Sequence, residues 1–495
     1  MATNNLSLSP SACYQALSAR DARFDGLFFF GVRSTGIYCR PVCKARTPMQ
    51  HNCHFFTHPA QAEGAGFRPC LRCRPELAPG QALRWSNQDA SHMLAHQALA
   101  WMDQRAPHEG AWQVSTLADR MGVGARHLRR ILHTHLGVTP SQYRQTQRLL
   151  RAKQLLCDTQ LPMGQVATLS GFSSPRQFNR AFALHYQLKP TQCRRSGTLP
   201  APTRIRLSYR PPFDHAAMMH FWRQRAVPGL EWCEANTPDG ESFARVMTLE
   251  VPGGICHGWV SLQFEPVVHQ VVVHISDNFW PHLSLCLMRL RWALDLDADP
   301  LAMEAALKTD FPHGGGIRVP GAWNGFELAV RAVLGQQVSV AAANTYAKRL
   351  VHTLGTPVTS PWAELTHAFP TPTQMLAASP DQLGSLGIVK QRQKALHALA
   401  QAVCKGGLNL NPGGQVAERV QALMALPGIG AWTAQYIAMR AMRWPDAFPA
   451  GDLVVQQRLG VRDAPNPARA ASEWAQRWQP WRSYGVLRLW QTQET

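Results

Sequence analysis

The sequence predicts a multidomain α+β protein, and two observations support this fold class. The chain has 495 residues, about three times the ~150 residues of a typical domain. The residue pattern also changes along it: residues 1–84 are rich in cysteine, aromatic and turn residues, and residues 85–195 are helical with short breaks. Strand-like runs such as RVMTLEV and HQVVVHI follow before residue 295, and from about residue 320 short helical segments are broken by glycine and proline.

The charge distribution favours a polyanionic partner, nucleic acid before membrane. The net charge is +19, of which residues 1–84 carry +6, residues 85–199 carry +9 and the rest of the chain +4. The alternative is a basic background without a specific partner. No apolar run approaches the ~20 residues of a membrane span, and no signal peptide is visible. We therefore expect a cytoplasmic protein whose twelve cysteines are free, buried or metal-bound.

Four cysteines in the first region have the spacing of metal ligands. Three residues separate Cys39 from Cys43, and two residues separate Cys70 from Cys73. Soft thiolates close together in a reducing compartment are typical of a tetrahedral Zn2+ site. The alternative is four unrelated buried cysteines. The spacing predicts a small four-cysteine zinc domain over residues 1–84.

The same region resembles a known repair domain. The segments DGLFFFGVRSTGIYCRPVCKARTP, NCHFF and AGFRPCLRCRPE are similar to the methylphosphotriester-repair domain of Ada-type adaptive-response proteins, over roughly residues 12–80. The resemblance implies that the four cysteines bind zinc and that Cys39 also accepts a methyl group from a damaged DNA phosphate. A zinc-bound thiol is held as the nucleophilic thiolate. Methylation would change the formal charge of the site from −2 to −1, so the modified domain should bind DNA more tightly.

The helical region at residues 85–195 contains two predicted helix-turn-helix units, at residues 117–135 and 163–185. Apolar side chains at helical spacing, such as Leu117 and Leu128, mark the buried faces. The second helix of each unit carries side chains that can hydrogen-bond to base edges or phosphates. These candidates are Arg126, Arg129, Arg130, Arg176, Gln177, Asn179 and Arg180. The alternative is a solvated basic surface.

This region resembles the AraC-type double helix-turn-helix domain. The two units are joined by TPSQYRQTQRLLRAKQLL, and GFSSPRQFNRAFALHYQLKPTQCRR is similar to the second half of that signature. The resemblance implies binding to promoter DNA and transcription activation, with RNA polymerase as a further partner. In Ada-type regulators this domain follows the zinc domain directly, as here. The stretch at residues 196–204 looks like a linker.

The run LPGIGAWTAQYIAMRA at residues 426–441 has the form of a helix-hairpin-helix. Pro427, Gly428 and Gly430 allow a tight turn and a close approach of the backbone to a DNA phosphate. Together with AFPAGDLVVQQRL, NGFELAVRAVLGQQVSV and RWQPWRSYGVLRLW, the run resembles the AlkA-type 3-methyladenine DNA glycosylases. The resemblance implies an α/β subdomain over residues 205–318 and a helical catalytic core over residues 319–495.

The resemblance assigns Asp452 as the catalytic carboxylate. It would stabilise the positive charge that develops on the sugar when an alkylated purine such as 3-methyladenine is released, after the base has left the duplex. The alternative is an N-cap for the helix that follows, and both roles can hold together. Trp432, Tyr436 and Trp490 match aromatic walls for a flat cationic base. Their alternative is ordinary core packing.

Two positions refine this interpretation. Gln337 in GQQVSV occupies the place of an apolar wedge in the best-known family member. It could hydrogen-bond to the orphaned partner base, or it could indicate weaker flipping or another intercalating residue. Bifunctional hairpin glycosylases carry a nucleophilic lysine where this chain has Trp432, and no lysine follows Lys405. The sequence therefore predicts a monofunctional glycosylase that uses water.

Together these patterns predict a fused damage sensor, transcription activator and alkylpurine DNA glycosylase. One alternative is a regulator whose glycosylase-like part is catalytically inactive and serves for DNA affinity. The other is an AraC-type sensor of a small metabolite, which should lack a zinc cluster. The intact Asp452 argues against the inactive glycosylase, and the cysteine pattern argues against the metabolite sensor.

Overall fold

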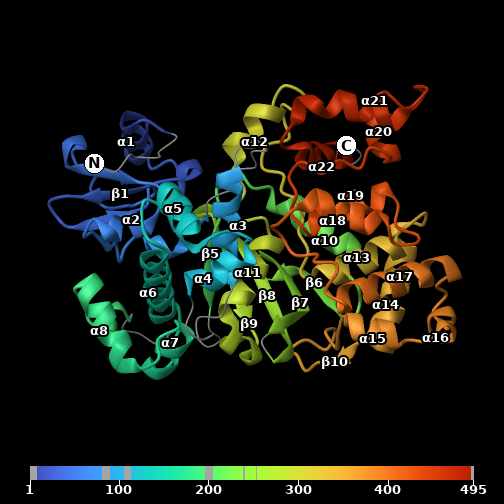
Figure 1. Cartoon of the computed structure of the whole chain (residues 1–495), viewed down its shortest axis with the longest axis horizontal. Helices are drawn as coiled ribbons and strands as arrows, with labels where there is room; N and C mark the ends of the chain where they lie inside the picture. Colours follow the sequence, from blue (N-terminus) through green and yellow to red (C-terminus); the bar gives the residue numbers. More distant parts are fainter. Residues whose placement is uncertain are drawn as a thin grey trace.

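The computed structural model describes residues 8–80, 90–104, 113–194, 204–237, 240–251 and 253–491. Figure 1 shows three regions that follow the chain, from the N-terminal sheet and its neighbouring helices to a central sheet and a C-terminal group of helices. The predicted linker at 196–204, except Arg204, lies outside the described residues, and so does the boundary expected near residue 84. Within the described ranges, no helix is long and apolar enough to cross a membrane.

The N-terminal region is a four-stranded sheet in the order β3-β1-β2-β4. Strand β1 is antiparallel to β2 and β3, whereas β2 and β4 are parallel. The elements are α1 (Pro10–Ala19), η1 (Ala22–Phe24), β1 (Phe29–Val32), β2 (Ile37–Cys39), η2 (Gln50–Asn52), β3 (Cys53–Phe56), α2 (Pro59–Gly64), β4 (Arg68–Pro69) and η3 (Pro75–Leu77). The parallel pairing brings the ends of β2 and β4 together, and one cysteine pair begins at each end.

The described part of residues 90–194 contains seven helices, and both predicted helix-turn-helix units are present. They are α3 (Ala90–Gln104), α4 (Val114–Arg120), α5 (Ala125–Leu136), α6 (Pro140–Asp158), α7 (Met163–Leu169), α8 (Pro175–Tyr186) and α9 (Pro190–Cys193). In the turns, Gly122 and Gly171 have φ values of 68° and 83°, a conformation that favours glycine. The long α6 connects the units and begins at a capping box of Thr139 and Gln142.

The central sheet has five antiparallel strands in the order β5-β9-β8-β7-β6. The elements of this part are β5 (Ile205–Ser208), α10 (His215–Arg225), β6 (Glu231–Thr237), β7 (Gly240–Val251), β8 (Gly254–Glu265), η4 (Pro266–Val268), β9 (Gln270–Ile275), η5 (Asp277–His282), α11 (Leu283–Ala293) and α12 (Pro300–Leu307). The runs RVMTLEV and HQVVVHI lie in β7 and β9, as predicted. One hydrophobic cluster joins Leu156 of α6 and Phe182 of the second helix-turn-helix unit to Leu207 and Val271 of this sheet.

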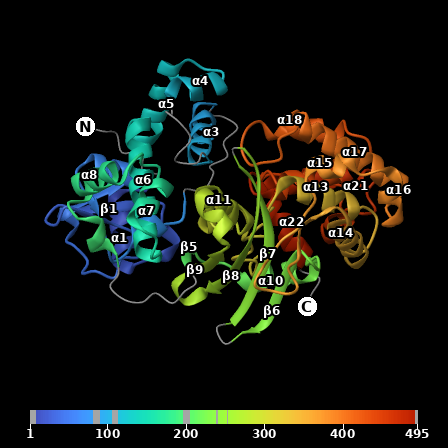
Figure 2. The ribbon, with the colours of Figure 1, turned by 90° about the horizontal axis from the view of Figure 1, so that it is seen from below.

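The C-terminal region is helical and contains the largest hydrophobic cluster. Its elements are α13 (Gly325–Leu334), α14 (Val340–Leu354), β10 (Thr356–Pro357), β11 (His367–Ala368), α15 (Pro372–Ala377), α16 (Pro380–Ser385), α17 (Lys390–Cys404), α18 (Val416–Met424), α19 (Ala431–Arg440), α20 (Leu453–Arg458), α21 (Pro467–Trp474), η6 (Ala475–Trp478) and α22 (Arg482–Gln491). Residues of α13, α19 and α22 line one cavity together with α10. Figure 2 shows α13 and α22 on the opposite side of the central sheet from α6, α7 and α8.

Buried ion pairs connect the N-terminal region to α6. Arg74 Nη1 donates to Asp158 Oδ1 at 2.6 Å, and Lys153 Nζ donates to Glu76 Oε2 at 2.5 Å. All four side chains are almost fully excluded from solvent. Breaking one partner of such a pair would leave an uncompensated buried charge, so these contacts hold the first two regions together.

Arg210 makes a second connection, between the N-terminal region and the central one. Its side chain is fully buried. It donates to the backbone oxygens of Asp25 and Gly80 on one side and of Asp297 and Ala298 on the other. One guanidinium therefore satisfies four carbonyl groups from three separate segments of the chain.

Candidate functional site

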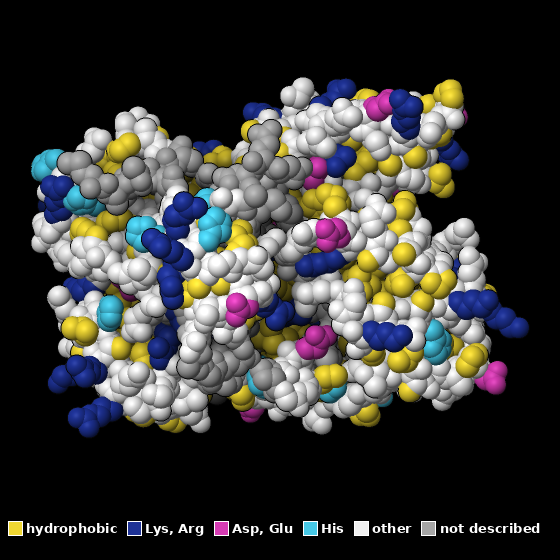
Figure 3. Space-filling model, in the orientation of Figure 1, with side chains coloured by type: hydrophobic (Ala, Val, Ile, Leu, Met, Phe, Trp, Pro, Cys, Tyr) yellow, Lys and Arg dark blue, Asp and Glu magenta, His cyan; other side chains and the backbone are white. Residues whose placement is uncertain are grey.

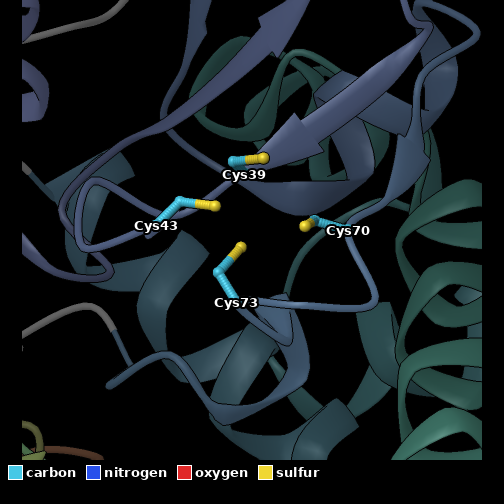
Figure 4. A group of neighbouring side chains, drawn as sticks. All are labelled: Cys39, Cys43, Cys70 and Cys73. Atoms are coloured by element: carbon cyan, nitrogen blue, oxygen red, sulfur yellow. The ribbon is translucent and has the colours of Figure 1, made fainter. Parts of the chain in front are cut away.

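The four predicted metal ligands converge in the N-terminal region. Cys39 ends β2 and Cys70 follows β4, and Figure 4 shows the sulfur atoms of Cys39, Cys43, Cys70 and Cys73 turned toward a common centre. All four Sγ atoms lie within 4.8 Å of one another. Four sulfurs bound at ~2.3 Å to one Zn2+ would be roughly 3.8 Å apart. The cluster therefore has the size of a tetrahedral zinc site.

The donor set also fits a divalent cation chemically. The backbone N–H of Arg72 donates to Cys70 Sγ at 3.3 Å, and that of Arg40 donates to Cys73 Sγ at 3.4 Å. Hydrogen bonds from neighbouring thiols, first from Cys43, raise the pKa of Cys39, whereas the bond with Cys39 lowers the pKa of Cys70. Mutual repulsion would keep four adjacent thiolates from coexisting without a cation. The protein therefore has a four-cysteine site for Zn2+.

The predicted DNA-reading side chains all lie on exposed helix faces. Arg126, Arg129 and Arg130 are exposed on α5, whose buried face carries Leu128 and Leu132. On α8, exposed side chains flank the buried Phe178 and Phe182; they are Arg176, Gln177, Asn179 and Arg180. Lys and Arg side chains are prominent over α5, α6 and α8 in Figure 3. Gln177 departs from the expectation in part, because its Oε1 accepts hydrogen bonds from the backbone N–H and the hydroxyl of Ser173.

The predicted hairpin joins α18 to α19, and its tip is open. Pro427, Gly428 and Gly430 are exposed, whereas Ile429 is buried. Gly428 has a φ of 76°, and Gly430 is the N-cap of α19 without a side-chain capping bond. The first N–H groups of α19 are therefore available to an anion such as a DNA phosphate.

Asp452 lies between two indole rings at the start of α20. Its Oδ2 accepts from Trp432 Nε1 at 2.8 Å, and its Oδ1 accepts from Trp490 Nε1 at 3.2 Å. Oδ1 also accepts from the backbone N–H of Val455 at 3.0 Å, so Asp452 is the N-cap of α20. The capping role that was the alternative from sequence is therefore confirmed. The same carboxylate faces the cavity.

The three predicted aromatic residues surround this carboxylate. Trp432 and Tyr436 are one turn apart on α19 and stack with ring centroids 5.3 Å apart and an interplanar angle of 10°. The rings of Tyr436 and Trp490 have centroids 6.2 Å apart. All three are only partly buried and line a cavity of about 940 Å³ together with Asp452. Tyr436 and Trp490 also pack against the hydrophobic core.

A network of ion pairs, which the sequence analysis did not predict, lines another side of this cavity. Buried Arg245 donates to Glu231 at 2.8 Å and to Glu327 at 2.7 Å, and Arg331 contacts the same two carboxylates at 3.0 and 3.2 Å. Burial raises the pKa of Glu231, but Arg331 and Arg245 lower it by more. The pKa of Glu231 therefore lies below its ordinary value. Glu231 and Arg331 are 100 residues apart, so no local pattern could have paired them.

Gln337 lies beside the hairpin, in the loop between α13 and α14. Its side chain is exposed, and its φ of 54° is unusual for a residue other than glycine. The preceding Gln336 fixes this loop, because its Nε2 donates to Gly428 O at 2.9 Å and to Thr433 Oγ1 at 3.0 Å. The structure thus holds Gln337 next to the hairpin in a strained backbone conformation.

Four family models match successive parts of the chain. They are the metal binding domain of Ada at residues 12–76, a helix-turn-helix domain at residues 117–196, the AlkA N-terminal domain at residues 204–324, and the HhH-GPD superfamily of base excision DNA repair proteins at residues 330–480. Fold and sites therefore define a zinc-binding, DNA-binding protein with a base-excision glycosylase domain.

The relatives specify the family. A protein of Mycobacterium tuberculosis, described as a probable bifunctional transcriptional activator/DNA repair enzyme AlkA, is 39% identical over 97% of this chain and 96% of its own. The chain belongs to this family of bifunctional transcriptional activators and DNA repair enzymes. DNA-3-methyladenine glycosylase 2 of Escherichia coli is 33% identical over 58% of this chain and 96% of its own.

Further similarities cover single parts of the chain. The bifunctional transcriptional activator/DNA repair enzyme Ada of Escherichia coli is 36% identical over 29% of this chain and 37% of its own. Among solved structures, a 3-methyladenine DNA glycosylase from Archaeoglobus fulgidus is 20% identical, covers 57% of this chain and 96% of its own, and has a TM-score of 0.46.

Proposed function

We propose that the protein excises alkylated purines from double-stranded DNA by hydrolysis and combines this activity with methylphosphotriester sensing and transcription activation. The observation that carries the glycosylase proposal is the Asp452 carboxylate, held by two indole N–H groups at the edge of an aromatic cavity. The glycosylases among its relatives support the same activity. This constellation argues against a catalytically inactive glycosylase domain.

The chemistry follows from the hydrogen bonds of Asp452. When the C1′–N bond breaks, its electron pair leaves with the base and positive charge develops on the sugar. Both carboxylate oxygens already accept N–H bonds, which fix the position of the carboxylate. Asp452 would stabilise the sugar cation, and water would then add to C1′ and lose its proton to Asp452 or to solvent. The product is a free base and an intact abasic strand.

The test is base release from methylated duplex DNA by the wild-type protein and by Asp452→Asn. The amide keeps the shape and a capping oxygen but removes the charge, so we expect no 3-methyladenine release and nearly unchanged folding and duplex binding. Undiminished release by the variant would assign catalysis to another carboxylate. Monofunctional action is tested on the same duplex with borohydride, since a trapped covalent adduct or strand nicking would reveal an amine nucleophile.

For the N-terminal region we propose that Cys39 is the methyl acceptor. The site would supply a thiolate to the methyl carbon of a methylphosphotriester, and the DNA phosphodiester would leave with the bonding electrons. Peptide mass mapping should add one methyl group to Cys39, and DNA affinity should rise after transfer. A methyl group on Cys43, or unchanged affinity, would refute this account.

The helix-turn-helix region completes the proposal. Exposed Arg126, Arg129 and Arg180 and the amide of Asn179 support contact with promoter DNA, with transcription activation through RNA polymerase as its consequence. Replacing Arg129 or Arg180 by alanine should weaken promoter binding without changing base release from non-promoter DNA. Equal losses in both assays would indicate a general folding defect.

A further inference from the structure

The charge of a damaged base decides what its release requires. A purine alkylated at N3 or N7 is cationic and departs as a neutral molecule. An uncharged damaged purine departs as an anion unless a ring nitrogen gains a proton during bond cleavage. A glycosylase that accepts both classes therefore benefits from a proton donor in the base pocket.

Tyr436 occupies the centre of the aromatic group in this cavity. It stacks on Trp432, with ring centroids 5.3 Å apart, and lies next to Trp490 at 6.2 Å. Arg440 follows one turn later on α19, and its Nη1 donates to the Tyr436 hydroxyl oxygen. Arg440 is itself held by a 2.6 Å hydrogen bond from its Nε to the backbone oxygen of Pro320.

The hydrogen bond from Arg440 leaves the hydroxyl proton of Tyr436 free to be donated. A guanidinium group has donors and no acceptor, so Arg440 can bond only to the phenol oxygen. Among the residues that the structure describes, no group accepts the Tyr436 hydroxyl proton. A base that enters the cavity could therefore accept it at a ring nitrogen.

The surrounding charges favour transfer of that proton. Burial raises the pKa of Tyr436, but Arg440 and Arg225 and, further away, Arg331 lower it below its ordinary value. Each arginine comes from a different helix, namely α19, α10 and α13. The acidic side chains that line the same cavity have other partners. Asp452 accepts from the indole N–H groups, and Asp214 accepts from the backbone N–H of Ala217. Glu231 and Glu327 form ion pairs with Arg245 and Arg331.

We infer that Tyr436 donates a proton to the departing base when the damaged purine is uncharged, with Arg440 as the positioning residue. The inference rests on the proposed glycosylase function and deepens it. The Tyr436 O–H bond breaks as a ring nitrogen of the base gains the proton, and the C1′–N electron pair moves into the purine. Arg440 stabilises the resulting phenolate. Water then adds to C1′, and the proton that it releases restores the phenol through solvent.

The experiment compares two bases under single-turnover conditions. Duplexes of one sequence carry either 7-methylguanine, which is cationic, or hypoxanthine, which is uncharged. Tyr436→Phe keeps the ring and its stacking but removes the hydroxyl. Because general acid catalysis contributes ~10²-fold or more, the ratio of 7-methylguanine to hypoxanthine release should rise about 100-fold. A folding defect would lower both rates and leave this ratio unchanged.

Arg440→Gln supplies a second readout, the pH dependence of hypoxanthine release. In the wild type, this rate should fall at alkaline pH as Tyr436 loses its proton. Removing the cation raises the pKa of Tyr436, so the alkaline fall should move to higher pH. A purely structural role of Arg440 would lower the rate without moving the profile.

The outcomes separate the two proposals. Equal losses of both bases in a Tyr436→Phe protein whose thermal unfolding matches that of the wild type would overturn the proton-donor role while the glycosylase function stands. A wild type that releases 7-methylguanine but not hypoxanthine would do the same. A wild type that releases neither base from its duplex would overturn the glycosylase proposal and this inference with it.

Discussion

The Asp452 carboxylate is positioned by aromatic side chains rather than by other charges. Trp432 and Trp490 bring indole N–H groups to opposite oxygens, and Val455 supplies a backbone N–H. An aromatic residue that lines the cavity thus has a second task, which is to orient the Asp452 carboxylate. The two tasks can be separated experimentally because the indole N–H can be removed without removing an aromatic ring.

We predict that Trp432→Phe lowers base release about 10- to 100-fold. The hydrogen bond that it removes ends on a charged group, where such bonds contribute ~1.5–3 kcal/mol. The measurement is the single-turnover rate on 7-methylguanine. Trp474→Phe in α21 is the control, because Trp474 packs on Trp478 away from the cavity. Equal effects of both substitutions would contradict the role of the N–H group.

Gln337 carries a second prediction at this scale. Its φ of 54° is readily adopted by glycine, so Gln337→Gly should fold normally. If the side chain fills the space of the flipped nucleotide, the variant should lose activity on duplex DNA and retain it on single strands. Rate measurements on duplex and single-stranded DNA test this prediction. Equal rates of the wild type and Gln337→Gly on duplex DNA would show that another residue acts as the wedge.

Among the elements, the hairpin between α18 and α19 depends on Gly428. An added Cβ at this position would meet the Cβ of Ala395 at 3.0 Å, whereas at Gly460 it would meet nothing within 4 Å. Both residues have positive φ, at 76° and 67°. The two positions therefore share the backbone strain of an alanine substitution and differ in steric contact.

We predict that Gly428→Ala and Gly460→Ala each lower the free energy of unfolding by roughly 1–2 kcal/mol, which is the cost of a left-handed alanine. Only Gly428→Ala should also weaken binding to non-specific duplex DNA, because it displaces the hairpin tip. Denaturant unfolding and a binding titration measure the two effects. Similar DNA affinities for both variants would show that the hairpin does not contact the DNA.

At the scale of the whole molecule, the regions pack as one unit. Arg40 donates to the backbone oxygen of Cys73 at 3.1 Å and forms a buried ion pair with Asp25. The backbone of Asp25 in turn accepts from Arg210 at 2.8 Å, and Arg210 reaches Ala298. Polar contacts therefore run without interruption from the cysteine cluster to the glycosylase part.

Glu63 links the N-terminal region to the helix-turn-helix region and gives a pH-dependent prediction. Its carboxylate accepts from Tyr38, from Thr146 of α6 and from Tyr186 of α8. Burial raises its pKa from 4.5 to about 7, although these bonds and Lys153 lower it in part. The folded state therefore holds a proton that the unfolded state loses above pH 4.5.

The stabilisation from Glu63 is present below about pH 4.5 and is lost as the pH rises to about 7. The glutamine in Glu63→Gln cannot titrate. As the pH rises from about 4.5 to about 7, the free energy of unfolding of the variant should therefore increase relative to wild type by up to about 3 kcal/mol. Thermal unfolding of both proteins with zinc present, from about pH 6 to about pH 8, measures the upper part of this change. A constant difference between the two proteins would contradict the prediction.

Local patterns in the sequence were sufficient to predict the order of the regions and many of the residues that carry their chemistry. The paired cysteines, the two helix-turn-helix units and the hairpin are short-range features, because spacing and turn residues dictate them. The N-cap at Asp452 is equally local. The catalytic role of Asp452 and the methyl-acceptor role of Cys39 remain predictions that rest on resemblance.

Only the tertiary structure decided which distant groups meet. The indoles that hold Asp452 lie 20 and 38 residues away, and the Arg331–Glu231 contact spans 100 residues. Arg210 donates to the backbone oxygen of Asp25, which lies 185 residues away. Such contacts depend on how whole elements pack, since one buried donor can satisfy any acceptor that packing brings within reach. For that reason the sequence by itself determined the reactive groups, and the fold determined the partners that orient them.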